Sequence, residues 1–148
     1  MLRACVVRAV ISASFILAAA VPSTAFQLIA PDEASKPDDP TATKGISRGP
    51  KVTALSPAPA AGFIKSPFNW RVKFEAFGGA RIDKDTIVVT YRKSPAIDLT
   101  QRMQHFIDTA GITVDGAEVP PGEHRIRIDV KDTNGRPGWA ELTIKVAK

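Results

Sequence analysis

The chain has 148 residues, enough for one domain with flanking segments but not for two full domains. Its net charge is +5, but Arg3 and Arg8 belong to a leader, and the remaining 18 basic and 15 acidic residues give +3. So small a surplus does not argue for nucleic-acid binding, which calls for a strong basic stripe, and we expect no nucleic-acid partner.

The first 25 residues have the three parts of a secretory signal peptide. Arg3 and Arg8 give a positive start, and residues 10–21 are apolar but shorter than the roughly 20 residues that cross a bilayer. Small side chains at 23–25 predict cleavage between Ala25 and Phe26. The short apolar stretch disfavours the alternative, an uncleaved anchor. We therefore predict a periplasmic or secreted protein with no stable membrane insertion after cleavage.

Cysteine usage limits the chemistry of the exported chain. Cys5 is the only cysteine, and it precedes the apolar part of the leader, whereas the lipid-bearing cysteine of a lipoprotein follows it. After cleavage no thiol remains for a disulfide, a thiolate metal site or a nucleophile. Apolar burial must therefore hold the fold, and residues 51–148 are numerous enough for that.

Residues 26–50 are predicted to be a disordered linker. They are poor in aromatic side chains and rich in Pro, Asp, Lys, Thr and Ala, with prolines at positions 31, 37, 40 and 50. Such a composition buries too little apolar surface to offset the entropy of ordering the chain.

Residues 51–148 show short alternating runs between turn residues, the pattern of an all-β domain. Alternation predicts that Trp70, Phe74, Ile126 and Ile144 point into one shared interior between two sheets. Residues 132–135 read as a turn, which makes the last two strands a hairpin. The expected strands are Val52–Leu55, Phe68–Ala76, Thr86–Arg92, Ile112–Val119, the run after Gly122, and Ala140–Val146.

Residues 98–107 break this pattern and predict one short inserted helix. Leu99, Met103 and Phe106 recur at helical spacing. Asp98 is placed to cap the start, with Gln101 in the capping-box position and Gly111 beyond the end. We expect this helix to cover one edge of the sandwich.

Several of these segments resemble bacterial Ig-like domains. In the first half the resemblance lies in Leu55–Pro57 and in Arg81–Val89, an Asp-containing turn that leads into a β-branched strand. In the second half it lies in Val119–Ile126 and Val130–Gly135, a proline–glycine turn, a strand and an Asp-x-x-Gly hairpin. The resemblance covers most of residues 51–148 and implies an Ig-like antiparallel β-sandwich used as a structural or adhesive module. One sandwich architecture serves many tasks, so it says little about function.

No motif in the chain predicts catalysis, and we expect a non-enzymatic protein without a cofactor. The chain after the leader has two histidines, and no Gly-x-Ser-x-Gly elbow accompanies them. We interpret His124 as a structural hydrogen-bonding residue and His105 as a solvated helix residue. Glu118, Glu123 and Glu141 are too scattered to nominate a glycosidase pair.

Metal binding is the alternative to a binding module. Small exported sandwiches include periplasmic copper carriers, and Met103 lies near His105 in the sequence. Residues two apart do not share a helix face, however, and the predicted N-terminal residue is Phe26 rather than histidine. Asp132 and Asn134 lack the remaining ligands of a calcium loop, so a plain turn is favoured. We nominate no metal ligand.

What remains is one outer face of the predicted sandwich. Arg125, Arg127 and Lys131 alternate on the outer side of one strand, with Arg92 and Lys145 on its neighbours, and Trp139 starts the last strand out of phase with its buried residues. Arginine beside an exposed tryptophan favours a partner-binding face, for an anionic protein or polymer of the cell envelope. The competing interpretation is a solvated face with cross-strand pairs, such as an arginine with Glu141.

Overall fold

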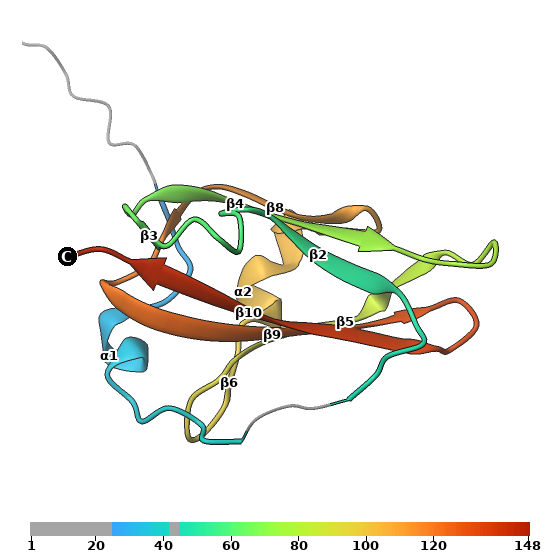
Figure 1. Ribbon diagram of the computed structural model, residues 1–148, viewed down its shortest axis with the longest axis horizontal. Helices are drawn as coiled ribbons and strands as arrows, with labels where there is room; N and C mark the ends of the chain where they lie inside the picture. The colour runs from blue at the N-terminus through green and yellow to red at the C-terminus, as the bar shows by residue number, and fades with distance from the viewer. Residues whose placement is uncertain (1–24, 42–44) are drawn as a thin grey trace, which may run out of the picture.

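The protein is a two-layer β-sandwich in the computed structural model, which describes residues 25–41 and 45–148 (Figure 1). The upper sheet of Figure 1 has the strand order β1-β8-β4-β2, with β7 also paired to β8, and the lower sheet has the order β3-β10-β9-β5-β6. The all-β sandwich is therefore confirmed, but the prediction of purely antiparallel sheets is wrong at the edges, because the short strands β1 and β3 pair in parallel with β8 and β10. Apart from Ala25 the leader lies outside the described residues, so its cleavage stays a prediction.

The elements follow the predicted order, with short additions at the N-terminus and at the strand edges. Their bounds are β1 Phe26–Gln27, α1 Pro31–Ala34, β2 Lys51–Ser56, β3 Phe63–Ile64, β4 Phe68–Glu75, β5 Ile82–Tyr91, β6 Ile97–Asp98, α2 Thr100–Met103, the 3-10 helix η1 Gln104–Phe106, β7 Ile107–Asp108, β8 Gly111–Glu118, β9 Gly122–Asp132 and β10 Pro137–Val146. Within the described part of the chain, no helix is long and apolar enough to cross a membrane.

The core forms where the alternating patterns of the two sheets meet. Trp70 and Phe74 of β4 and Ile126 and Ile144 of β9 and β10 are all at most 5% exposed and belong to one cluster of buried side chains. This confirms the shared interior predicted from alternation. Burial of apolar surface is the main force that holds such a sandwich together.

The β9–β10 hairpin is confirmed, and its register places the outer face. Arg127 lies opposite Glu141, and Trp139 lies opposite Asp129. At the turn, the Asp132 carboxylate accepts the backbone N–H groups of Asn134 and Arg136 and the Arg136 Nε–H, at 2.7 to 2.9 Å. The turn interpretation of residues 132–135 is therefore confirmed.

The inserted helix is shorter than predicted. Residues 98–107 divide into the end of β6, the single turn α2, η1 and the start of β7. Asp98 does accept the Thr100 N–H at 2.8 Å, but Leu99 occupies the cap position. Leu99 and Met103 are buried as predicted, because the turn lies on β5 and points both side chains into the core.

The prediction of a disordered linker is wrong for the described residues between 26 and 50. β1 pairs in parallel with β8, and Leu28 and Ile29 are at most 1% exposed in the core. The domain therefore begins at Phe26 rather than Lys51. The average composition of the whole segment did not reveal the apolar residues at positions 26, 28 and 29. These residues bury much apolar surface for so short a segment.

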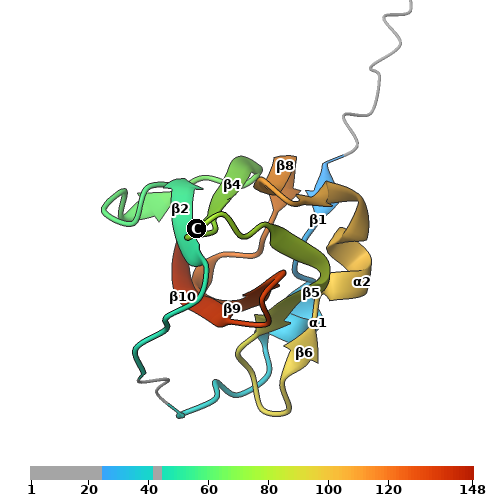
Figure 2. The ribbon, with the colours of Figure 1, turned by 90° about the vertical axis from the view of Figure 1, so that its right-hand side faces the viewer.

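After α1, the polar segment Pro37–Thr41, here called the strap, lies against the outer side of the lower sheet (Figures 1 and 2). Asp38 forms an isolated antiparallel bridge with Lys93, just beyond the end of β5. Further on, Gly49 and Pro50 are buried against Pro137 and Gly138 at the start of β10. Residues 37–41 and 49–50 thus both contact the lower sheet ahead of β2.

Candidate functional site

All six predicted site residues lie on the outer face of the lower sheet. Arg125, Arg127 and Lys131 alternate along β9 with buried inward residues, and Trp139 and Lys145 occupy the matching positions of β10. Arg92 follows β5 directly, and its N–H donates to the Arg125 carbonyl at 2.9 Å. The face predicted from two-residue periodicity therefore exists as a geometric feature.

Arg127 and Trp139 form a stacked pair at the centre of this face. The Arg127 guanidinium carbon lies 4.8 Å from the centroid of the Trp139 ring. The Asp129 carboxylate accepts Nε–H and Nη2–H of Arg127 at 2.9 and 2.8 Å, and this hydrogen bonding raises the pKa of Arg127. Both contacts fix the guanidinium plane against the indole, an arrangement that arginine makes better than lysine.

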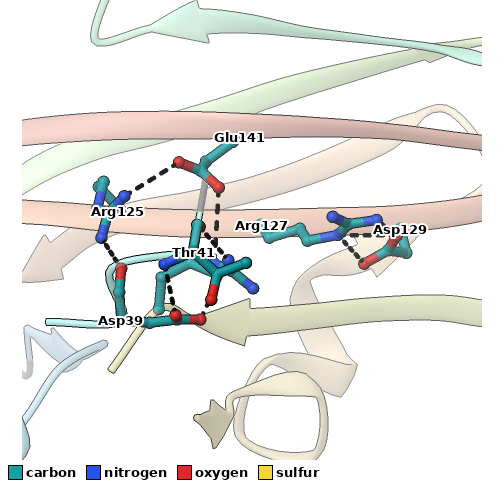
Figure 3. Close-up of polar contacts among 7 residues, drawn as sticks. Asp39, Thr41, Arg125, Arg127, Asp129 and Glu141 are labelled. Carbon is teal, nitrogen blue, oxygen red and sulfur yellow. Dashed lines mark hydrogen bonds and ion pairs between the residues drawn. The ribbon is translucent and has the colours of Figure 1, made fainter. Parts of the chain in front are cut away.

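A second cluster joins Arg92 and Arg125 through Glu141 (Figure 3). The Glu141 carboxylate lies 3.6 Å from Arg92 Nε and 3.7 Å from Arg125 Nη1. From the strap, Asp39 Oδ2 lies 3.0 Å from Arg92 Nη2, which also donates to the Thr41 carbonyl at 2.7 Å. Arg125 Nη2 donates to the Asp39 carbonyl oxygen. The strap therefore covers both arginines.

These contacts neutralise the predicted basic stripe. The pairing of an arginine with Glu141, the competing interpretation above, is what the structure shows. Of the six predicted residues, all of which the structure describes, Lys131 is the exposed cation that forms no ion pair, since Lys145 lies 3.7 Å from Glu123 at the rim. The three arginines face an equal number of carboxylates, those of Asp39, Asp129 and Glu141.

The sequence analysis missed Asp38, Asp39 and Lys93. Lys93 Nζ lies 2.6 Å from Asp38 Oδ1, and the Lys93 side chain is only 6% exposed. The hydrogen bond from Lys93 lowers the pKa of Asp38. Bonds from Thr41, and then the charge of Arg92, lower the pKa of Asp39. The available signal was an acidic doublet and a basic doublet, Arg92–Lys93, but nothing local shows that they meet.

His124 is a structural residue, as interpreted. Its Nδ1 accepts the Tyr91 O–H at 2.8 Å, and its Nε2–H donates to the Pro120 carbonyl at 2.7 Å. Burial lowers the pKa of His124 and raises the pKa of Tyr91 to about 12. Both ring nitrogens are therefore occupied by partners that a neutral imidazole satisfies. His105 is exposed, in agreement with its interpretation as a solvated residue.

The residues considered for copper do not come together. Met103 is fully buried, whereas His105 points to solvent. Within residues 25–41 and 45–148, no three His, Cys, Asp or Glu side chains are grouped so that they could hold a metal ion.

The three scattered glutamates are also apart in the structure. Glu123 pairs with Lys145 and Glu141 with the two arginines. Glu118 instead lines a hollow of about 820 Å³ at the end of the sandwich where Ala25 and Lys148 lie. This hollow contains none of the six predicted site residues, so the concave surface and the charged face are separate features.

Comparisons with known proteins add one structural neighbour to this small two-layer β-sandwich. No protein-family model matches the chain, and no curated protein matches it. The chain is similar to the crystal structure of CopC from Methylosinus trichosporium OB3b, with 13% sequence identity and a TM-score of 0.41. The match covers 66% of this chain and 94% of that one. The sandwich class stated above depends on this chain's own sheets and core.

Proposed function

We propose that the protein is a non-catalytic, exported Ig-like module that binds a protein or polymer of the cell envelope. Its recognition surface is the patch of Arg127, Trp139, Lys131 and Val88 on the outer face of the lower sheet. The stacked Arg127–Trp139 pair carries this proposal. Tryptophan and arginine are the residues most enriched among those that dominate binding energy at interfaces.

The patch combines apolar area with a guanidinium group whose position is fixed by Asp129. Val88 of β5 is 40% exposed and lies opposite Asp129, which in turn lies opposite Trp139, so these side chains form one row across the sheet. Ile46, 96% exposed, follows Gly45, where an added Cβ would lie 3.6 Å from Cζ2 of Trp139. Since Asp129 already orders Arg127, a partner would not bear the full entropy of fixing that side chain.

The test is capture of envelope proteins and polymers on the immobilised purified chain. We expect Trp139→Ala and Arg127→Gln each to reduce capture of the main partner at least roughly 30-fold, the range of a dominant interface residue. The matched control is Arg71→Gln, an arginine on the outer face of the upper sheet that pairs with Asp115 at 3.5 Å. Unchanged capture by both patch variants, with circular dichroism spectra like that of the wild type, would contradict the proposal.

A further inference from the structure

Three cations meet at one corner of the lower sheet, beyond the end of β5. Arg92 and Lys93 follow β5, and Arg125 lies beside them on β9. We call these three residues the cradle. Glu141 is positioned between the two arginines and holds them side by side. In the structure the chain's own strap fills the cradle, with Asp38 on Lys93 and Asp39 on the two arginines; Figure 3 draws the contacts of Asp39.

The strap binds the cradle through its backbone as a short added strand. The Ser94 N–H donates to the Pro37 carbonyl at 2.9 Å, and the Asp39 N–H donates to the Arg92 carbonyl at 3.4 Å. These bonds flank the antiparallel bridge between Asp38 and Lys93. They continue the edge of β5 where β6 has ended, and only an extended polypeptide can make them.

The strap also binds the cradle through two consecutive carboxylates. Successive side chains of an extended segment point to opposite sides. Asp38 accordingly meets Lys93, whose amine lies 5.3 Å from the centroid of the buried Tyr91 ring, while Asp39 meets Arg92 on the outer face. One acidic doublet therefore satisfies cations on both sides of the sheet edge.

Without the strap the cradle needs another anion. Arg92, Lys93 and Arg125 would then face Glu141 as their remaining carboxylate, which leaves two positive charges in excess. With the strap in place the Lys93 side chain is 6% exposed, and a nearly buried ammonium is costly unless a carboxylate lies beside it. An incoming segment with a carboxylate at each of two consecutive positions meets this need.

The strap can leave without unseating the rest of the N-terminal segment. Pro37, Asp38, Pro40 and Thr41 are exposed, and the contacts of the strap are polar and ionic. No residue of the strap belongs to the apolar core, so its attachment depends on the ion pairs of Asp38 and Asp39 and on two backbone hydrogen bonds. On either side of the strap, Leu28 and Ile29 are buried in the core and Gly49 and Pro50 are buried at the start of β10.

We infer that the cradle is a binding site for an extended acidic peptide segment of a partner, and that Asp38 and Asp39 occupy it when no partner is present. The site uses residues other than Arg127 and Trp139, so it stands independently of the proposed recognition patch. Its ligand is recognised by two consecutive carboxylates on an extended backbone.

The experiment weakens the hold of the strap on the cradle by replacing its two aspartates with asparagine. The double variant Asp38→Asn/Asp39→Asn is titrated with a fluorescent peptide that has the sequence of residues 36–41, and binding is measured by anisotropy. We expect the double variant to bind this peptide and the wild type to bind it at least roughly tenfold more weakly, because the tethered strap competes at a high effective concentration. Adding Arg125→Gln to the double variant should abolish binding, whereas adding Trp139→Ala should leave it unchanged.

Two probes decide what the cradle recognises. A control peptide with asparagine at both acidic positions should fail to bind the double variant, and equal binding would overturn the role of the carboxylates. Inorganic tripolyphosphate should compete only weakly, and competition as strong as that of the peptide would overturn backbone recognition. Absence of any peptide binding by a folded double variant overturns the proposal.

If the double variant does not fold, the proposal can still be tested on the wild type. Excess peptide should displace the strap and accelerate hydrogen exchange of the Asp39 amide, and an unchanged rate would overturn the proposal. Analytical ultracentrifugation tests occupancy by a second copy. The expected result is a monomer, and a wild-type dimer that the double variant does not form would overturn occupancy within one chain.

Discussion

The N-terminal segment is attached to the sandwich in two different ways, on either side of α1. Before α1, the anchor Phe26–Ile29 buries apolar side chains and pairs with β8. After α1, the strap Pro37–Thr41 lies on the outer sheet surface and is held by charges and two backbone bonds. Both come from a stretch whose overall composition predicts disorder. The difference teaches that burial makes one attachment part of the fold, whereas polar contacts leave the other exchangeable.

The anchor gains its strength from contacts on several sides. The Phe26 ring lies 4.6 Å from the Phe106 ring, and the Leu28 N–H donates to the Glu118 carbonyl at 3.0 Å. Arg102 donates to the Leu28 carbonyl at 2.8 Å and forms a two-bond ion pair with Glu33. The anchor thus joins β8 and the α2 region into one packed unit.

The largest effect on stability should come from truncating a buried side chain of the anchor. We expect Leu28→Ala to lower the free energy of unfolding by about 2–5 kcal/mol, the cost of removing a fully buried leucine side chain. Urea denaturation measures this change, and Ile46→Ala, at a 96% exposed site, is the control with no expected loss. A loss below about 0.5 kcal/mol for Leu28→Ala would show that the anchor is peripheral to the fold.

Lowering the pH should release the strap but not the anchor. This effect should be smaller than that of Leu28→Ala. The hydrogen bond from Lys93 lowers the pKa of Asp38, and bonds from Thr41 lower the pKa of Asp39, so their contribution to strap docking is complete above the ordinary value of 3.8. It is lost as the pH falls below 3.8 through the lowered values, because protonation then favours the released strap. Apolar burial of Leu28 and Ile29 does not titrate.

Amide NMR spectra from pH 7 down to about pH 2, well below the ordinary aspartate value, provide the measurement. The strap signals should move toward those of a free peptide while the signals of Leu28 and Ile29 keep their positions. His124 adds a separate change, because burial lowers its pKa, and its contribution to global stability is present above 6.5 and lost as the pH falls further. Loss of the strap and anchor signals at the same pH would contradict the distinction between an exchangeable strap and an anchor that belongs to the fold.

Much of the fold was predictable because it depends on local alternation. The runs in β4 and β9 place Trp70, Phe74 and Ile126 inward whatever their partners are, and the same parity places Arg127 outward. The hairpin required only adjacent strands and a turn. Asp132 shows how local such a turn is, since the backbone donors to its carboxylate lie within four residues.

The strap was not predictable because its contacts join distant parts of the chain. Asp38 and Lys93 are 55 residues apart, and Asp39 and Arg125 are 86 apart. The average composition of residues 26–50 does not reveal the four-residue anchor. It also does not reveal that distant cations pair with the acidic doublet. Local alternation therefore put these side chains on one outer face, whereas their pairing with Asp39 required the structure.

The smallest effect on global stability should come from Asp39→Asn. The asparagine can still accept a hydrogen bond from Arg92, and Glu141 continues to hold both arginines, so the midpoint of urea unfolding should stay at the wild-type value. The loss of one ion pair should instead appear locally, as faster hydrogen exchange of the amides of residue 39 and Ser94 than in the wild type. The Leu28 amide is the internal control and should exchange only with global unfolding. If Asp39→Asn shifted the midpoint as far as Leu28→Ala does, strap and anchor would be one cooperative unit, and the strap could not be an exchangeable occupant of the cradle.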